Sequence, residues 1–192
     1  MGEAARSWCG REASGVIERG LMEALKERIR HVPDFPKAGI LFYDVTTLLK
    51  DREGFQLAVE AMTAPHVGKD IDLVVGIESR GFIFGSAIAD RLKAGFAPVR
   101  KPGKLPSLTR RASYSLEYGS DSLEIHEDAA ASGQRVLIVD DLLATGGTAA
   151  ATVGLVRGLG AEIVGVQFLI ELVGLDGRSK LKGENINAVL QY

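Results

Sequence analysis

The chain has 192 residues, 46% of them hydrophobic and 25% charged, and its formal net charge at neutral pH is −2. This length and composition suit one globular domain with a substantial core, and they argue against a disordered, collagen-like or membrane-spanning chain. The nearly balanced charge gives no reason to expect a protein that binds nucleic acid or an anionic membrane in bulk.

Residues 1–20 are interpreted as an N-terminal extension with mixed charge. They contain no apolar segment of the kind that forms a secretory signal. Cys9 is the only cysteine of the chain, so no disulfide can form within it, which favours a reducing compartment. We therefore expect a cytoplasmic protein.

The first half of the chain predicts two helices and a strand. Leu21, Leu25 and Ile29 are four residues apart and would form one face of a helix that ends before Pro33. A second helix is marked by apolar residues at helical spacing from Phe55 to Met62. The branched apolar run Ile71–Ile77 is typical of a buried strand.

The same alternation continues in the second half. Ser79-Arg80-Gly81 leads into a helix that carries Phe82, Ile88 and Leu92. Val136–Val139 predicts a second buried strand, Thr148–Leu159 a helix that stops at Gly160, and Ile163–Ile170 a third strand.

Strands that alternate with helices predict an α/β fold, with a mainly parallel twisted sheet flanked by helices. The 23 glycines and the aromatic content of only 6% agree with tight turns between strands and helices. Residues 100–127 are the longest stretch without clear periodicity. Such a stretch inside a compact domain is usually a functional loop or lid, here with room for a short hairpin.

The segment Val136–Thr148, with sequence VLIVDDLLATGGT, carries the strongest functional signal. A buried strand brings Asp140 and Asp141 to its carboxyl end, where ligands bind in open α/β sheets. The Thr-Gly-Gly-Thr turn then opens a helix, and the free amides there favour a phosphate. A ribose phosphate satisfies both features, since its hydroxyls suit the two acids.

A plain junction between a strand and a helix is the alternative, with one of the two acids capping the helix. The other common phosphate-binding pattern, GxxxxGK[ST], does not occur in the chain. His31, His66 and His126 are scattered along the sequence and are interpreted as structural or exposed residues.

The VLIVDDLLATGGT segment resembles the phosphoribosyl-pyrophosphate-binding motif of the type I phosphoribosyltransferases. Further segments resemble the adenine phosphoribosyltransferases in particular, and the resemblance extends in order from about Leu21 to Tyr192. These segments are PDFP at 33–36, GILF at 39–42, ESRGF at 78–82, RKPGKLP at 100–106, YSLEYG at 114–119 and the terminal LQY. The resemblance implies one domain over residues 21–192, with a small hood region and a flexible catalytic loop at about residues 100–120.

The resemblance implies purine salvage: transfer of ribose 5-phosphate from phosphoribosyl pyrophosphate to adenine, which yields AMP and pyrophosphate and requires Mg²⁺. By similarity Asp140 and Asp141 hold the ribose hydroxyls. The 5-phosphate lies in the turn formed by Ala144, Thr145, Gly146, Gly147 and Thr148. We expect no direct protein ligands for Mg²⁺, which substrate oxygens and water would hold.

Three basic residues are implied in binding pyrophosphate. Arg80 has the planar guanidinium that suits bidentate contacts with phosphate, and the Glu78–Ser79 peptide before it tends to be cis in this family. Lys101 and Lys104 flank Gly103 on a loop that could close over the substrate. Arg110 and Arg111 are read as solvated surface residues.

The resemblance also assigns residues to the adenine base. Glu117 would handle the proton of a ring nitrogen, and Tyr118 would pack at the reacting ribose. Leu41, Phe42 and Arg80 would lie at the base, which main-chain groups would read. Tyr43 stands where some relatives have a basic residue, which leaves the contacts of the hood open.

Two other functions are considered. One is a phosphoribosyltransferase for another purine base such as hypoxanthine or guanine. The other is a regulator that binds phosphoribosyl pyrophosphate without catalysis and needs a basic surface for nucleic acid, for which residues 1–20 are too short and too mixed in charge. The family resemblance further implies a homodimer, and the balanced charge predicts no binding to nucleic acid or membranes.

Overall fold

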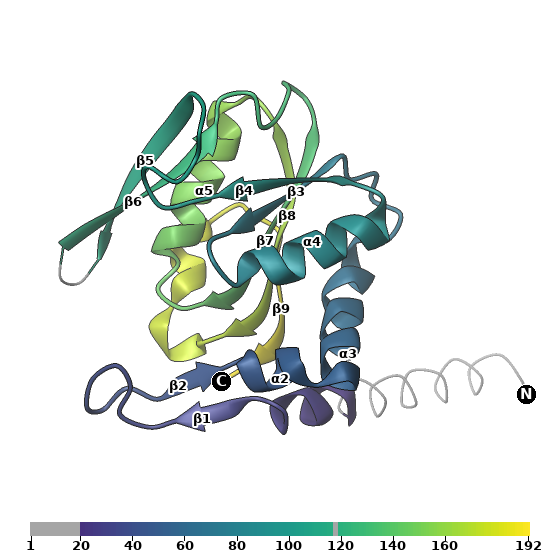
Figure 1. Ribbon diagram of the computed structural model, residues 1–192, viewed down its shortest axis with the longest axis vertical. Coiled ribbons are helices and arrows are strands. Elements are labelled where there is room, and N and C mark those ends of the chain that lie inside the picture. The colour runs from purple at the N-terminus through teal and green to yellow at the C-terminus, as the bar shows by residue number, and fades with distance from the viewer. Residues whose placement is uncertain (1–19, 117–118) are drawn as a thin grey trace, which may run out of the picture. The chain divides into compact units, whose positions relative to one another are not determined.

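The computed structural model in Figure 1 describes residues 20–116 and 119–192. Most of the predicted N-terminal extension, together with Glu117 and Tyr118, lies outside the described residues. The chain divides into two compact units, residues 1–60 and residues 61–192.

The first unit contains a helical segment at residues 20–26 and a small antiparallel pair of strands. Its elements are β1 (Arg30–Val32), β2 (Phe42–Asp44), α2 (Thr46–Lys50) and the first part of α3 (Arg52–Thr63). Leu25, Ile29, Val45 and Leu48 are buried in it.

The predicted first helix is therefore shorter than its apolar spacing suggests. Leu25 lies on the helix, but Ile29 lies beyond its end, so its assignment to the helix is wrong. The amides of Arg28 and Ile29 bond three residues back, to Leu25 and Lys26, which tightens the last turn before β1 begins. The predicted second helix is confirmed as α3.

The second unit is built on a five-stranded sheet in which every neighbouring pair of strands is parallel, in the order β4-β3-β7-β8-β9. The strands are β3 (Leu73–Ile77), β4 (Gly95–Val99), β7 (Arg135–Leu143), β8 (Glu162–Glu171) and β9 (Ile186–Gln191). The predicted fold class and the three predicted strands are confirmed.

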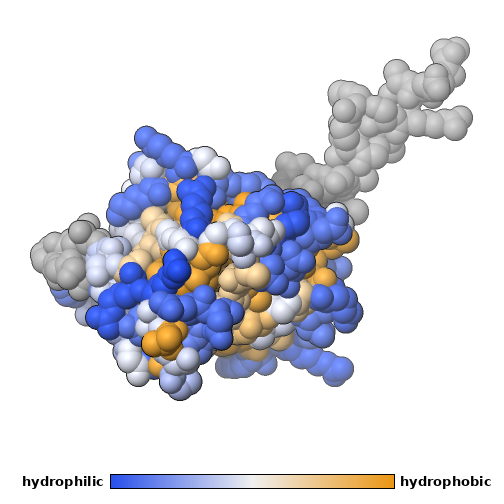
Figure 2. Space-filling view, turned by 90° about the horizontal axis from the view of Figure 1, so that it is seen from above, coloured by the Kyte–Doolittle hydropathy of each residue, from blue (hydrophilic) through white to orange (hydrophobic). Residues whose placement is uncertain are grey.

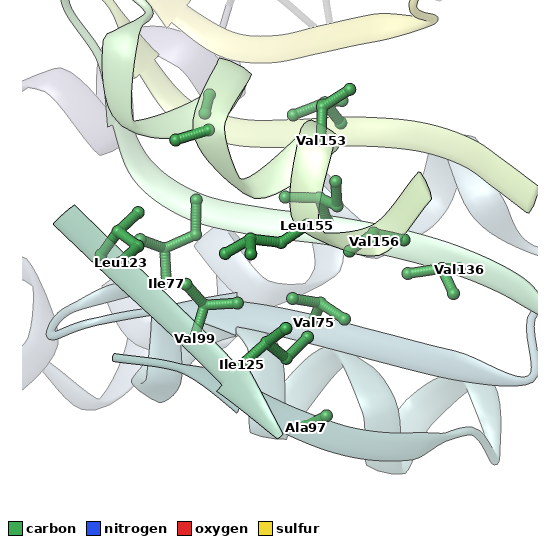
Figure 3. Packing of buried hydrophobic residues seen from close by; sticks show 14 of the residues in the cluster. Val75, Ile77, Ala97, Val99, Leu123, Ile125, Val136, Val153, Leu155 and Val156 are labelled. Carbon is green, nitrogen blue, oxygen red and sulfur yellow. The ribbon is translucent and has the colours of Figure 1, made fainter. Parts of the chain in front are cut away.

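Helices cover both faces of this sheet. On one face α5 (Gly147–Gly158) packs together with β6 (Gly119–His126), and Figure 3 shows Leu155, Leu123 and Ile125 of these elements meeting Val75 and Val99 of the sheet. On the other face lies α4 (Gly81–Leu92), whose Gly85 approaches Gly76 so closely that an added Cβ would lie 3.4 Å from the Gly76 Cα. Short 3₁₀ turns η1 (Ala64–His66), η2 (Val173–Leu175) and η3 (Gly177–Leu181) complete the unit.

Much of the stretch without periodicity is regular. β5 (Thr109–Leu116) pairs with β6 in an antiparallel hairpin, from Thr109 opposite His126 to Leu116 opposite Gly119. The possible short hairpin is therefore present, and it is longer than expected. The irregular part, residues 100–108, connects β4 to β5.

Two sheet strands are absent from the sequence predictions. β4 contains Gly95 and Pro98, which are poor strand residues, but it is an edge strand and tolerates proline there. β9 alternates only weakly between apolar and polar residues. Both form because β3 and β8 offer them a partner.

The face of the molecule in Figure 2 carries hydrophilic side chains with smaller hydrophobic areas between them. Among the described residues, no helix has both the length and the apolar character to cross a membrane.

Candidate active site

The turn between β7 and α5 forms a small pocket of about 80 Å³, lined by Asp140 and residues 142–149. Gly146 precedes the first residue of α5 and has a φ of +75°, a conformation that favours glycine. The first amides of α5 have no partner within the helix, so they face this pocket as hydrogen-bond donors for an anion. The predicted phosphate-binding residues 144–148 thus lie together.

The pocket turn is packed against a second backbone segment. A Cβ added to Gly146 would lie 2.3 Å from the Gly177 carbonyl oxygen, and one added to Gly177 would lie 2.2 Å from the Ala144 carbonyl oxygen. Both glycines are therefore required for this close contact.

The residue after Gly177 anchors this contact in the core. Arg178 donates two hydrogen bonds, of 2.6 and 2.8 Å, to the carboxylate of Glu171. Glu171 is buried at the end of β8, and Arg178 holds its pKa below the usual value.

The two adjacent acids have different surroundings. β7 continues to Leu143 because it pairs with β8 as far as Glu171, so both acids lie inside the strand and not after it. Asp141 is buried and its Oδ2 accepts a salt bridge of 2.6 Å from Nε of Arg80. Asp140 lines the pocket.

Burial raises the pKa of Asp140 well above its usual value, and the nearby Asp141 carboxylate raises it further. Gly81 also crowds this carboxyl, since a Cβ there would lie 2.9 Å from the Asp140 Oδ1. The start of α4 therefore fits against the acid pair only because residue 81 has no side chain.

Arg80 lies at the start of α4, directly after the Glu78–Ser79 peptide, which is cis as predicted. The Glu78 side chain accepts hydrogen bonds from the Arg100 guanidinium at 3.3 Å, from the Lys101 amide at 3.0 Å and from the Lys104 ammonium. Burial raises the pKa of Glu78, but the hydrogen bonds from Lys104 and Lys101, together with the positive charges of Lys104 and Arg100, outweigh burial and lower it overall. Glu78 therefore anchors the basic loop beside Arg80.

The loop and the hairpin are tied together by acidic residues of β6. The Lys101 ammonium donates to Asp121, and the Gly103 amide donates to Glu124 at 3.0 Å. Glu124 is buried and also accepts from Arg111 at 2.9 and 2.6 Å. Arg111 is exposed, as expected for a surface residue, and it is also the ion-pair partner of the buried Glu124.

Arg110 also has a structural contact, because its guanidinium donates to the carbonyl of Gly158 at the end of α5. Arg110 is exposed, which agrees with the expected surface position, and the contact with Gly158 is an addition to it. The reason is that the hairpin packs against α5, a contact that the sequence pattern did not indicate.

The sequence reasoning missed three polar residues of this region: Glu78, Tyr114 and Asp121. Their partners are distant in the sequence, so no local motif marks them. Only the position of Tyr114 and Asp121 on one hairpin, opposite each other, could have suggested that they act together.

The remaining predicted residues, which belong to the adenine end of the site, stay predictions. Leu41 and Phe42 belong to the first unit, where Phe42 begins β2. Glu117 and Tyr118 lie outside the described residues. Within residues 20–116 and 119–192, no group of three or more histidine, cysteine or acidic side chains is arranged to hold a metal ion.

A parallel sheet with an anion-binding turn after an acidic strand end is the arrangement expected of a phosphoribosyltransferase. The model of the family described as "Phosphoribosyl transferase domain" matches residues 46–189. The chain belongs to this family.

Its relatives define the branch. The chain is 61% identical over 170 residues to the adenine phosphoribosyltransferase of Acidobacterium capsulatum. The alignment covers 88% of this chain and 94% of the relative. It is 55% identical over 170 residues to the adenine phosphoribosyltransferase of Koribacter versatilis, in an alignment that covers 88% of this chain and 93% of that relative. Within the family, the chain groups with the adenine phosphoribosyltransferases.

Solved structures agree with this grouping. The adenine phosphoribosyltransferase of Rhodothermus marinus superposes with a TM-score of 0.87 at 53% identity, over 91% of this chain and 99% of that one. That of Saccharomyces cerevisiae, solved with adenine and an imino-altritol bisphosphate, has a TM-score of 0.84 at 42% identity, over 90% and 99%.

Proposed function

We propose that this chain is an enzyme of purine salvage that transfers ribose 5-phosphate from phosphoribosyl pyrophosphate to adenine. The products are AMP and pyrophosphate. The observation that carries this proposal is the pocket after β7, in which free helix amides lie next to the half-buried Asp140.

The pocket suits the two parts of ribose 5-phosphate. Amides at the start of α5, including that of Thr148, and the hydroxyl of Thr145 donate to the 5-phosphate. The carboxylates of Asp140 and Asp141 accept hydrogen bonds from the ribose 2- and 3-hydroxyls. Both groups lie at one end of one strand, so a single sugar phosphate can reach them together.

In the reaction, N9 of adenine forms a bond to C1 of the ribose while the bond from C1 to the pyrophosphate oxygen breaks. The electron pair of that bond leaves with pyrophosphate. The adenine, now bonded through N9 to the ribose, gives up one ring proton. Positive charge develops on the sugar, which the acid pair stabilises. We assign the acceptance of the proton to Glu117, by the family resemblance.

The basic residues around the pocket fit the leaving group. Arg80 is fixed by Asp141, and Lys101 and Lys104 are held nearby on the loop that Glu78 anchors. These three cations would bind the pyrophosphate oxygens. Leu41 and Phe42 are proposed to contact adenine, with Tyr118 against the ribose.

Mg²⁺ is proposed to take part without a direct protein ligand. Substrate oxygens and water, which are the ligands that this hard cation prefers, would hold it. Bound Mg²⁺ would neutralise part of the negative charge that develops on pyrophosphate.

Three further properties are proposed. Residues 21–192 act as one catalytic domain, which the family match across residues 46–189 supports. The single cysteine supports a cytoplasmic location. Exposed apolar side chains on α4 and β4 support a homodimer.

A pyrophosphate-release assay with adenine, hypoxanthine, guanine and no base tests the reaction. We expect fast pyrophosphate release with adenine and not with the other bases or without a base. Asp140→Asn and Glu117→Gln should each lower turnover by about 100-fold or more. Circular dichroism would show that both variants keep their fold. Equal release with every base, no release with adenine, or full activity of both variants would contradict the proposal.

A further inference from the structure

Tyr114 and Asp121 form a cross-strand pair in the hairpin of β5 and β6. They are direct partners in the register, and the Tyr114 hydroxyl donates to the Asp121 Oδ2 at 3.2 Å. Both side chains are half-buried. The proposed reaction uses neither of them.

Each member of the pair contacts a different part of the proposed substrate site. The Thr148 hydroxyl, in the first turn of α5 and on the wall of the pocket, donates to the Tyr114 hydroxyl at 3.3 Å. On the other side, the Lys101 ammonium donates to Asp121. Thr148, Tyr114, Asp121 and Lys101 therefore form one continuous chain of hydrogen bonds.

The charges in this chain support a fixed ion pair. The hydrogen bond from Lys101 lowers the pKa of Asp121 despite partial burial. Burial lowers the pKa of Lys101, but the hydrogen bond with Asp121, the Asp121 charge and the contacts with Tyr114 together outweigh burial, so this pKa is raised overall. Lys101 is therefore charged, and its ammonium has a defined position.

The backbone of the loop and of β6, on either side of these hydrogen bonds, is also held in place. Arg100 and Glu124 exchange backbone hydrogen bonds of 2.9 and 2.7 Å between the loop and β6. Because the backbone of the loop is fixed, the remaining freedom of Lys101 is in its four-carbon side chain, which carries about 2 kcal/mol of rotamer entropy. Asp121 removes that freedom before a ligand arrives.

We propose that Asp121 and Tyr114 are positioning residues for the pyrophosphate end of phosphoribosyl pyrophosphate. Asp121 holds the Lys101 ammonium, and Tyr114 ties Asp121 to Thr148 of the pocket, so the distance between the two anion-binding positions is set in advance. Neither residue touches the substrate. This inference rests on the proposed function and adds two residues to its machinery.

The test compares the kinetics of Asp121→Ala, Asp121→Asn, Tyr114→Phe and Lys101→Met with those of the wild-type enzyme. We expect Asp121→Ala to raise the KM for phosphoribosyl pyrophosphate about fivefold to tenfold, with kcat and the KM for adenine changed by less than about twofold. Tyr114→Phe should also raise the KM for phosphoribosyl pyrophosphate, but by a smaller factor than Asp121→Ala. Asp121→Asn partly rescues, because its amide oxygen still accepts from Lys101.

The double variant K101M/D121A shows whether Asp121 acts through Lys101. If it does, the double variant has the same KM for phosphoribosyl pyrophosphate as Lys101→Met alone. Ser113→Ala is the matched control, since Ser113 is an exposed cross-strand partner in the same hairpin, bonded only to Ser122 among the hydrogen bonds found within the described residues. It should leave all constants unchanged.

An unchanged KM in Asp121→Ala, or effects of D121A and K101M that multiply, would overturn the inference. Calorimetric titration of the same variants with phosphoribosyl pyrophosphate measures binding without turnover. If the wild-type protein releases no pyrophosphate with adenine, the proposed function fails, and the binding data still decide whether Asp121 acts through Lys101.

Discussion

Asp140 and Asp141 are adjacent in the sequence, but the fold gives their carboxyl groups different surroundings. Asp141 is buried with Arg80 as its ion-pair partner at 2.6 Å. Asp140 has a raised pKa because of burial and because of the Asp141 charge. A raised carboxyl pKa means that the folded protein holds the charged form of Asp140 at a cost in stability.

The first prediction is that Asp140→Asn makes the protein more stable at neutral pH while it reduces turnover. The folded state binds a proton at Asp140 more tightly than the unfolded chain does. Stability is therefore lost as the pH rises from about the usual value of 3.8 toward the raised pKa, and the loss persists above it. The asparagine variant avoids this loss, so thermal unfolding at pH 7 should show a higher Tm.

Asp141→Asn is the matched control and should have the opposite effect. It leaves the Arg80 guanidinium without its carboxylate partner, which costs about 1–3 kcal/mol for a partly buried charged group. A lower Tm in Asp140→Asn at pH 7, or a gain in Tm for Asp141→Asn, would contradict this account.

His66 is a buried residue with a structural contact away from the pocket. Its Nε2 lies 2.8 Å from Oε1 of Gln167, whose amide nitrogen donates to the Phe168 carbonyl at 2.8 Å. The Gln167 oxygen therefore faces the imidazole, so His66 donates from Nε2. Burial lowers the pKa of His66, and the hydrogen bond to Gln167 offsets only part of this effect.

The second prediction concerns acid sensitivity. Because the pKa of His66 is lower in the folded state, the unfolded chain takes up the proton first as the pH falls below its usual value of 6.5. His66 thus costs stability at acidic pH, at up to about 1.4 kcal/mol per pH unit. The loss of Tm between pH 7 and pH 5 should be smaller in His66→Gln than in the wild type, and equal losses would exclude this role.

At the scale of elements, the pocket turn depends on a segment that follows one helix, α5, and one strand, β8, later in the chain. The turn at Gly146 packs on the backbone of Gly177, and Arg178 with the buried Glu171 fixes that segment to the end of β8. The shape of the phosphate site is therefore set by two backbone segments in contact, and not by the TGGT sequence alone.

The third prediction is that Gly177→Ala damages the pocket. Its Cβ would lie 2.2 Å from the Ala144 carbonyl oxygen, so one of the two segments must move. We expect a loss of about 1–3 kcal/mol in stability and a higher KM for phosphoribosyl pyrophosphate, measured by denaturant unfolding and steady-state kinetics.

Gly154→Ala provides the control for this substitution. Gly154 lies inside α5, is exposed and has nothing within 4 Å of an added Cβ. Alanine there should stabilise the protein by about 0.5–1 kcal/mol because it favours the helix. The role of Gly177 would be disproved if both alanine variants behaved alike.

At the scale of the whole molecule, exposed apolar side chains on α4 and β4 indicate a surface for assembly. Ile83 on α4 and Phe96 on the edge strand β4 are 41% and 37% exposed, although both are large and apolar. The Phe96 ring packs edge-on against Phe82, with the ring centroids 6.1 Å apart. An exposed apolar area of this kind suits a contact with a second copy of the chain.

The fourth prediction is that light scattering gives twice the 20.5 kDa mass of one chain, and that Ile83→Glu shifts the mass toward the monomer. Val173→Glu serves as control, because Val173 is also exposed but lies on η2. A wild-type monomer at micromolar concentration would refute the proposed homodimer.

The sequence predicted most of the central sheet and, within the site, the acid pair and the phosphate-binding turn. Buried parallel strands such as Leu73–Ile77 and Val136–Val139 are continuous apolar runs, and α3, α4 and α5 have helical spacing, so these elements could be read locally. The edge strand β4 could not, since Gly95 and Pro98 have no strand preference of their own. Ile29 was misplaced because backbone bonds, and not apolar spacing, end the first helix.

The sequence by itself determined the strand, the acid pair and the glycine turn that form one local unit, because their geometry depends on neighbouring residues. Only the tertiary structure decided which of the two acids is paired with Arg80, which segment supports the turn, and how Lys101 is linked to Thr148. These contacts join residues far apart in the chain. They depend on strand order and on close packing between elements, which no local spacing encodes.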